Sequence, residues 1–180
     1  MSTTAPSPCN PPAAQRGVTL FELIVALSVL GVLLAIGVPA YTNIVRANQI
    51  SAQSNNLLQS FTLARSEALK RGLRVSVCPI RNDDTSACLT ASDWAGGWMV
   101  FEDDFGNPGT VDPGDRLLQV FAPAAGILIT TIAPSVVYLP SAAVQSQASF
   151  DVSKSGCTGE QMRAVNVATT GRVSIQHRAC

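Results

Sequence analysis

The chain has 180 residues, enough for one domain of ordinary size, and its formal net charge is zero. This balance gives no support for a chain-wide electrostatic attraction to nucleic acid, which would show as a basic excess. Hydrophobic residues make up 47% of the chain and charged residues only 13%, an imbalance that a membrane segment would explain.

The N-terminal region divides into a polar leader and an apolar run. Residues 1–17 are rich in Pro, Ser and Ala and lack apolar periodicity, which predicts a disordered leader. Residues 18–40 contain a single charge, Glu22, and as a helix would span roughly 30 Å, about the thickness of a bilayer's hydrocarbon core. A signal peptide fits less well, because its apolar core is shorter and a small-residue cleavage site follows it. The run predicts a transmembrane helix.

Helical patterning continues over residues 41–71, where apolar residues recur at alternating three- and four-residue steps. Gly72 is a suitable stop signal after Lys70 and Arg71 in the last turn. We therefore expect one helix from about Thr19 to Arg71, apolar all round in its first half and amphipathic in its second. Pro39 lies inside it and predicts a kink, since proline removes a backbone donor. The amphipathic stripe consists of Ala47, Ile50, Ser54, Leu57, Phe61, Ala64 and Ala68.

After Gly72 the pattern changes to short strand-like runs separated by turn residues, which predicts a β domain over residues 72–180. The whole chain then has an α+β plan, with a long helix packed on an antiparallel sheet. The predicted strands are Leu73–Ile80, Gly97–Glu102, Leu117–Ala122, Ile127–Ile132, Val136–Leu139, Ala148–Val152, Arg163–Ala168 and Arg172–Gln176.

Four of the five cysteines follow the apolar run, which suggests an oxidising compartment and two disulfides. Three pairings are open. Cys78–Cys88 and Cys157–Cys180 are favoured because each closes a local loop; free, buried thiols are the alternative. A zinc site is disfavoured, since the chain has no C-x-x-C motif and one histidine. We expect no metal and no cofactor, and we expect the domain after the run to lie outside the cytoplasm.

Glu22 stands out because a carboxylate at the centre of a bilayer costs on the order of 3 kcal/mol. One interpretation is an interfacial acid that reaches headgroup water. The other starts from Gly17: a cut after it would create an α-amino group on Val18, about one helical turn from the Glu22 side chain. In a low dielectric the two charges would attract strongly, within one chain or between neighbours.

Gly17, Glu22 and Pro39 together resemble the pattern of type IV prepilins, in which a leader ends in Gly and an apolar helix carries Glu as its fifth residue and Pro near its midpoint. Val18 stands where that family usually has Phe, and the leader is longer and less basic than usual. The resemblance implies that prepilin peptidase cuts Gly17–Val18 and methylates the new amine. The helix would wait in the inner membrane as a single pass and then pack into a filament core, with Glu22 guiding assembly.

Four segments further along resemble, in their order, the FimT/GspH family of minor pilins and pseudopilins. The resemblance implies a type IV pilin-like fold, major and other minor pilins as partners, and a periplasmic C-terminal domain. It is greatest to the type IV pilus branch, FimT, and a GspH-like pseudopilin of a type II secretion system is the alternative. The segments are LARSEALKRG at 63–72, VSVCP at 75–79, GGWMVFEDDFGN at 96–107 and TTGRVSIQHRAC at 169–180.

Two segments can be read either as ordinary structure or as a ligand site. Trp94 and Trp98 could stack on a sugar or base, but the alternation of Trp98 with Val100 favours a core position. The acidic loop from Glu102 to Asp115 offers oxygen ligands for calcium, yet its spacing fits no EF-hand. We expect a solvated loop there.

DNA is a further candidate partner. Some FimT-like proteins resemble DNA receptors for natural transformation that act through a Gly-Arg-x-Arg segment. Here the matching residues run from Gly171 to Ser174, so the second arginine is absent. Phosphate contacts would be salt-sensitive and independent of sequence; a solvated strand edge is the alternative. The candidate DNA-contacting residues are Lys154, Arg163, Arg172 and Arg178.

No enzyme class fits the chain. It lacks G-x-S-x-G, Walker and HExxH motifs, and its one histidine, His177, lies near the C-terminus. The neighbouring Ser66 and Glu67 have no base beside them. A structural assembly subunit is the favoured class, and a nucleic-acid-binding module on the same scaffold is the second.

Overall fold

The computed structural model describes residues 17–81, 84–90, 93–122 and 125–180. The predicted leader lies outside these ranges except for Gly17. The chain divides into two compact units at the boundary between Ala40 and Tyr41.

One helix, α1, runs over Leu20–Arg71, and the structure begins it one residue after the predicted start. The backbone N–H of Glu22 donates to the Thr19 hydroxyl at 3.2 Å, so Thr19 caps the helix. Gly72 ends the helix with a positive φ of 70°, and its N–H donates to the Ala68 carbonyl at 3.0 Å. Pro39 lies within the helix, which continues through it.

All eight predicted strands are present, but they form two antiparallel sheets rather than one. The first sheet has the order β3-β2-β1-β5 and the second the order β4-β6-β7-β8. In chain order the strands are β1 Val75–Pro79, β2 Trp98–Glu102, β3 Arg116–Phe121, β4 Ile127–Thr130, β5 Val136–Tyr138, β6 Ala148–Lys154, β7 Met162–Val167 and β8 Val173–Arg178.

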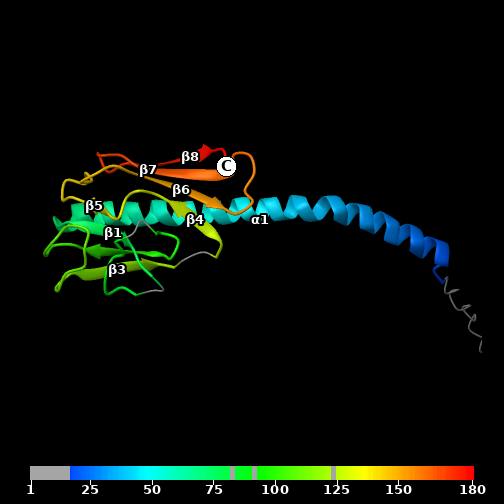
Figure 1. Ribbon diagram of the computed structural model, residues 1–180, viewed down its shortest axis with the longest axis horizontal. Helices are drawn as coiled ribbons and strands as arrows, with labels where there is room; N and C mark the ends of the chain where they lie inside the picture. Colours follow the sequence, from blue (N-terminus) through cyan, green and yellow to red (C-terminus); the bar gives the residue numbers. More distant parts are fainter. Residues whose placement is uncertain (1–16, 82–83, 91–92, 123–124) are drawn as a thin grey trace, which may run out of the picture. The chain divides into compact units, whose positions relative to one another are not determined.

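The second half of α1 forms the centre of the globular unit, with β7 and β8 on one side and β1 and β3 on the other (Figure 1). Its buried stripe joins both sheets in a single hydrophobic core. Phe61 is the clearest link, because its ring lies 5.1 Å from that of Phe150 in β6 and 6.3 Å from that of Trp94. The predicted stripe is buried at Ile50, Ser54, Leu57, Phe61, Ala64 and Ala68.

The two sheets differ in how they are covered. In β4 and β6, buried and more exposed residues alternate, as expected when one face meets the core. β1 is buried at every position, because its second face carries a small cluster of Cys78, Ile80, Met99 and Phe101. Cys88 and Val111, from the loops that follow β1 and β2, pack on that cluster. Loops therefore close the outer face of the first sheet.

Candidate functional site

The first half of α1 is an apolar surface with nothing packed on it. Every residue from Val18 to Ala40 is exposed, although most are large and hydrophobic. Within the described residues, α1 is the one helix long and apolar enough to cross a membrane, by length and composition. Burying this surface requires lipid or another protein chain.

Glu22 has a local role at the start of this surface. It lies three residues after Thr19, and Thr-x-x-Glu is the pattern of a capping box. A carboxylate in the first turn also interacts favourably with the helix dipole. The capping pattern was visible in the sequence, but the expectation for Glu22 rested on its charge alone. The structure places Gly17 and Val18 just ahead of the helix, both exposed.

Two disulfides cross-link the globular unit. Cys78 in β1 is bonded to Cys88 with a Cα–Cα distance of 5.6 Å, and Cys157 is bonded to Cys180 at 6.0 Å. These are the two local pairs that the sequence favours over the other pairings. The second bond joins the β6–β7 loop to the segment after β8, so it fixes one end of the second sheet.

The four candidate DNA-contacting residues do not form one patch. Arg178 is paired with Asp151 at 3.2 Å across the second sheet. Arg163 lies opposite His177 in the β7–β8 register. Arg172 precedes β8, five residues from His177 along an extended strand, which is roughly 17 Å.

Of the four residues, Arg172 has the side chain most accessible to a DNA phosphate. Its side chain is exposed and makes no hydrogen bond or ion pair with any residue the structure describes. Gly171 holds the turn before it with a φ of 73°. A side chain at Gly171 would lie 1.9 Å from the Ala142 carbonyl, so only glycine fits there.

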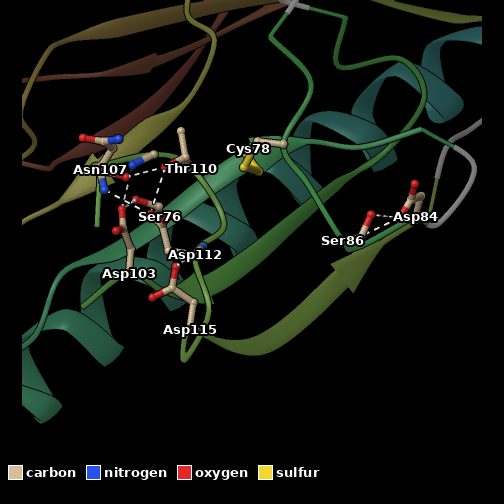
Figure 2. The surroundings of a disulfide bond; sticks show 11 residues. Ser76, Cys78, Asp84, Ser86, Asp103, Asn107, Thr110, Asp112 and Asp115 are labelled. Carbon is tan, nitrogen blue, oxygen red and sulfur yellow. Dashed lines mark hydrogen bonds between the residues drawn. A yellow bond between two sulfur atoms is a disulfide. The ribbon is translucent and has the colours of Figure 1, made fainter. Parts of the chain in front are cut away.

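The acidic loop was expected to be solvated, and at Asp103 this expectation is wrong. Asp103 is fully buried. Its carboxylate accepts hydrogen bonds from the Ser76 hydroxyl at 2.5 Å and from the Gly109 N–H at 2.7 Å (Figure 2). Burial raises the pKa of Asp103, and these two hydrogen bonds oppose the shift. Asp103 therefore fastens the loop to β1.

Two further acids of this loop, Asp112 and Asp115, satisfy its own backbone (Figure 2). Asp112 accepts from the Asn107 N–H at 3.0 Å, and Asp115 accepts from the Asp112 N–H at 2.8 Å. Among the described residues, no group of three or more His, Cys, Asp or Glu side chains could hold a metal ion. The carboxylates shape the loop.

Trp94 and Trp98 lie in the core, as the alternation of Trp98 with Val100 predicts. Both are fully buried. The Trp98 ring stacks on that of Phe121 with centroids 5.6 Å apart, and the Trp94 Nε1–H donates to the Ala133 carbonyl at 2.9 Å. Neither ring is available to stack on a sugar or base.

Comparison with solved structures identifies proteins similar to this chain. Type IV minor pilin FimU of Pseudomonas aeruginosa aligns with a TM-score of 0.56 and 16% identity over 72% of this chain and 89% of that chain. The minor pseudopilin EpsH from the Type 2 Secretion System of Vibrio cholerae gives a TM-score of 0.44 and 13% identity over 73% of this chain and 97% of that chain. The FimU alignment shows a shared fold.

One curated protein is similar to this chain in sequence. The Type IV major fimbrial protein FimA of Dichelobacter nodosus is 29% identical over 104 residues, which are 57% of this chain and 62% of that protein. The chain thus spans about three fifths of the length of this curated relative.

Two family models match the chain. Residues 12–38 match the prokaryotic N-terminal methylation motif, which includes the Gly17–Val18 bond and Glu22. Residues 53–171 match the family described as Type II transport protein GspH, and this range is more than half of the chain. The chain therefore belongs to the GspH family of pilins and pseudopilins, which are structural proteins and not enzymes.

Proposed function

We propose that this chain is a minor pilin of a type IV pilus that is stored in the inner membrane and assembled into the filament. The observation that carries the proposal is the first half of α1, which is apolar on all sides and exposed throughout. The methylation motif supports cleavage by prepilin peptidase at Gly17–Val18. Both disulfides lie after the membrane segment and support a periplasmic position for the globular unit.

Glu22 and Pro39 are the assembly residues in this proposal. Cleavage would place the new amine of Val18 about one turn from the Glu22 carboxylate. In an apolar filament core, an unpaired carboxylate is costly, so Glu22 selects the position at which an amine of the same or a neighbouring subunit meets it. Pro39 marks the end of the apolar half, where the helix passes into the globular unit.

Glu22→Gln tests this role. The variant keeps the length of the side chain and its ability to accept from an N–H, but it loses the charge. We expect it to remain in the membrane fraction at normal levels and to be strongly depleted from sheared filaments. Glu160→Gln, an exposed acid of the globular unit, is the matched control and should enter filaments normally. Normal incorporation of Glu22→Gln would refute the assembly role.

A pseudopilin of a type II secretion system is the second candidate, because the family model that covers most of the globular unit carries that description. A deletion strain separates the two. Loss of surface pili with normal secretion supports the pilus role. Loss of protein secretion with intact pili supports the secretion role.

Binding of extracellular DNA is a narrower role that we propose for the Arg172 turn. Arg172 is exposed and follows a glycine that packs against Ala142. Binding of duplex DNA by the full chain in detergent should fall for Arg172→Ala and not for Arg81→Ala, an exposed arginine elsewhere. It should also weaken steeply between low and physiological salt. No binding at low salt would end this role.

A further inference from the structure

Three cations of the globular unit lie beside the first turns of α1 after Ala40, and none of them forms an ion pair with a carboxylate that the structure describes. Arg46 donates to the Asn43 amide oxygen at 3.0 Å. The Lys154 ammonium donates to the Gln49 amide oxygen at 2.7 Å and to the Ala125 carbonyl at 3.2 Å.

Arg163 is the third of these cations. It donates to the Glu160 carbonyl at 3.2 Å and to the Ser51 hydroxyl at 3.4 Å. One of its guanidinium nitrogens also lies 2.6 Å from Nδ1 of His177. We call Arg46, Lys154 and Arg163 the proximal cations.

Most other cations of the globular unit are neutralised. Within the described ranges, five of them form ion pairs with carboxylates, and the proximal cations form none. Glu67, for example, accepts from Arg71 at 2.5 Å, and Asp103 lies 3.7 Å from Arg74. The proximal cations therefore keep an uncompensated positive charge. The paired cations are Lys70, Arg71, Arg74, Arg116 and Arg178.

The α1 residues that bond the proximal cations lie close to the end of the apolar run, which favours a membrane anion as their ligand. Asn43, Gln49 and Ser51 follow the last residue of the apolar run, Ala40, by roughly 5 to 17 Å of helix rise. The polar headgroup layer adds about 5 to 8 Å on each side of a bilayer's hydrocarbon core. Electrostatic attraction extends about 8 to 10 Å beyond that layer at physiological salt. Counted along α1 from Ala40, the residues that bond the three cations fall within this distance.

The same region carries an exposed aromatic residue and a cleft that two of the cations line. Tyr41 directly follows the apolar run and is 68% exposed, as is typical of aromatic residues at the level of lipid headgroups. Arg46 and Lys154 line one open cleft of about 180 Å³ together with Tyr41, Val45 and Gln49. Gly156 of the β6–β7 loop lies against the Arg46 guanidinium.

We propose that Arg46, Lys154 and Arg163 bind the phosphate groups of anionic phospholipids in the membrane that holds residues 18–40. This inference rests on the proposed membrane-stored state. Because none of their partners among the described residues is a carboxylate, the cations are held in place without an ion pair that would offset the charge that attracts phosphate. Phospholipid contacts of this kind would hold the globular unit at the membrane surface until the subunit is extracted into the filament.

DNA phosphates share this chemistry, and Lys154 and Arg163 were also candidate DNA contacts. Lipid is favoured because both residues are tethered to the helix segment that directly follows the apolar run, through Gln49 and Ser51. Arg172, the exposed arginine of the proposed DNA site, lies at the opposite end of β8 from the partner of Arg163.

The test titrates the delipidated full chain in neutral detergent with phosphatidylglycerol or phosphatidylcholine, and native mass spectrometry counts the retained lipids. The wild type should retain phosphatidylglycerol in preference, and less of it as salt rises. Attraction of about fivefold per cation predicts a loss on the order of 100-fold for Arg46→Gln/Lys154→Gln/Arg163→Gln. Lys70→Gln/Arg81→Gln/Arg116→Gln changes the net charge equally at exposed positions outside both proposed sites and should bind as the wild type does.

A conservative variant separates charge from folding. Arg46→Lys/Arg163→Lys keeps both charges and should retain most of the preference for phosphatidylglycerol. Equal retention of both lipids by the wild type, or an unchanged preference in the Gln triple variant, would overturn the inference. So would a triple variant that loses affinity for a 20-base-pair duplex but keeps its lipid preference. Lipid retention in detergent requires neither cleavage nor filament incorporation, so these failures would leave the proposed function standing.

Discussion

The two halves of α1 have opposite relations to the rest of the chain. Between Val18 and Ala40 every side chain is exposed, whereas the second half buries a continuous stripe centred on Leu57 and Phe61. The second half has polar residues on its other faces, so one orientation toward the two sheets is preferred. The first half is apolar all round and has no preferred inner face within its own chain. The same helix is therefore packed against the sheets over its second half and has an unpacked apolar surface over its first half.

Large-to-small substitutions would test this contrast with the largest effect. Phe61→Ala removes a ring that contacts Trp94 and Phe150 and should destabilise the globular unit by about 3 to 5 kcal/mol. Leu33→Ala, in the exposed half, should change that stability by no more than a few tenths of a kcal/mol. Chemical denaturation of the full chain in detergent measures both. Equal destabilisation by the two variants would contradict the division of the helix.

The disulfides belong to the folded unit, and their loss should affect it next most strongly. Cys157→Ala/Cys180→Ala opens a loop with a sequence separation of 23 residues and should cost about 3 kcal/mol. Cys78→Ala/Cys88→Ala opens a separation of 10 residues and should cost slightly less. Non-reducing peptide mapping checks the pairing, and thermal unfolding checks the cost. Any cross-pair between the two sets would contradict the structure.

Thr19→Ala tests the other end of the helix, where no tertiary contact assists. Loss of the cap should cost about 1 kcal/mol locally. Faster amide exchange over residues 20–23 in lipid vesicles would report it, with no change in the unfolding of the globular unit. Thr62→Ala, exposed on α1 in the globular unit, is the control. Unchanged exchange at residues 20–23 would show that Thr19 does not cap the helix.

Asp103 offers a smaller, pH-dependent effect confined to the globular unit. Its native pKa lies above the ordinary value because it is buried, so the native state holds the proton at a pH where the unfolded chain has lost it. Stability from this group is complete below pH 3.8 and is lost as pH rises through the native pKa. As pH rises through that range, the melting temperature of the wild type should fall relative to that of Asp103→Asn. Asp104→Asn, an exposed neighbour, should show no such trend, and a flat difference for Asp103 would contradict its burial.

The helix and the strands could be predicted because their signals are local. Period-3.6 and period-2 patterns, with Gly72 and the turn residues between strands, set the element order correctly. The division into two sheets was not predictable, because strand pairing depends on contacts between distant segments. The burial of Asp103 was missed for the same reason, since its partner Ser76 lies 27 residues away. The ion pairs of Arg74, Arg116 and Arg178 likewise join residues far apart in sequence.

The candidate site divides in the same way. Gly17, Glu22 and Pro39 form a motif readable in one stretch of sequence. Lys154 and Arg163 acquire a common location only through their contacts with Gln49 and Ser51, more than 100 residues earlier in the chain. Sequence reasoning grouped these two cations with Arg172 because they share a sign and a segment.

The central claim is that the exposed half of α1 is released at Gly17 and then buried among other pilin subunits. Mass spectrometry of this chain recovered from sheared surface filaments tests it most directly. We expect a mature chain that begins at Val18 with a methylated α-amino group and lacks residues 1–17. Recovery of the chain in filaments with the leader still attached would contradict it.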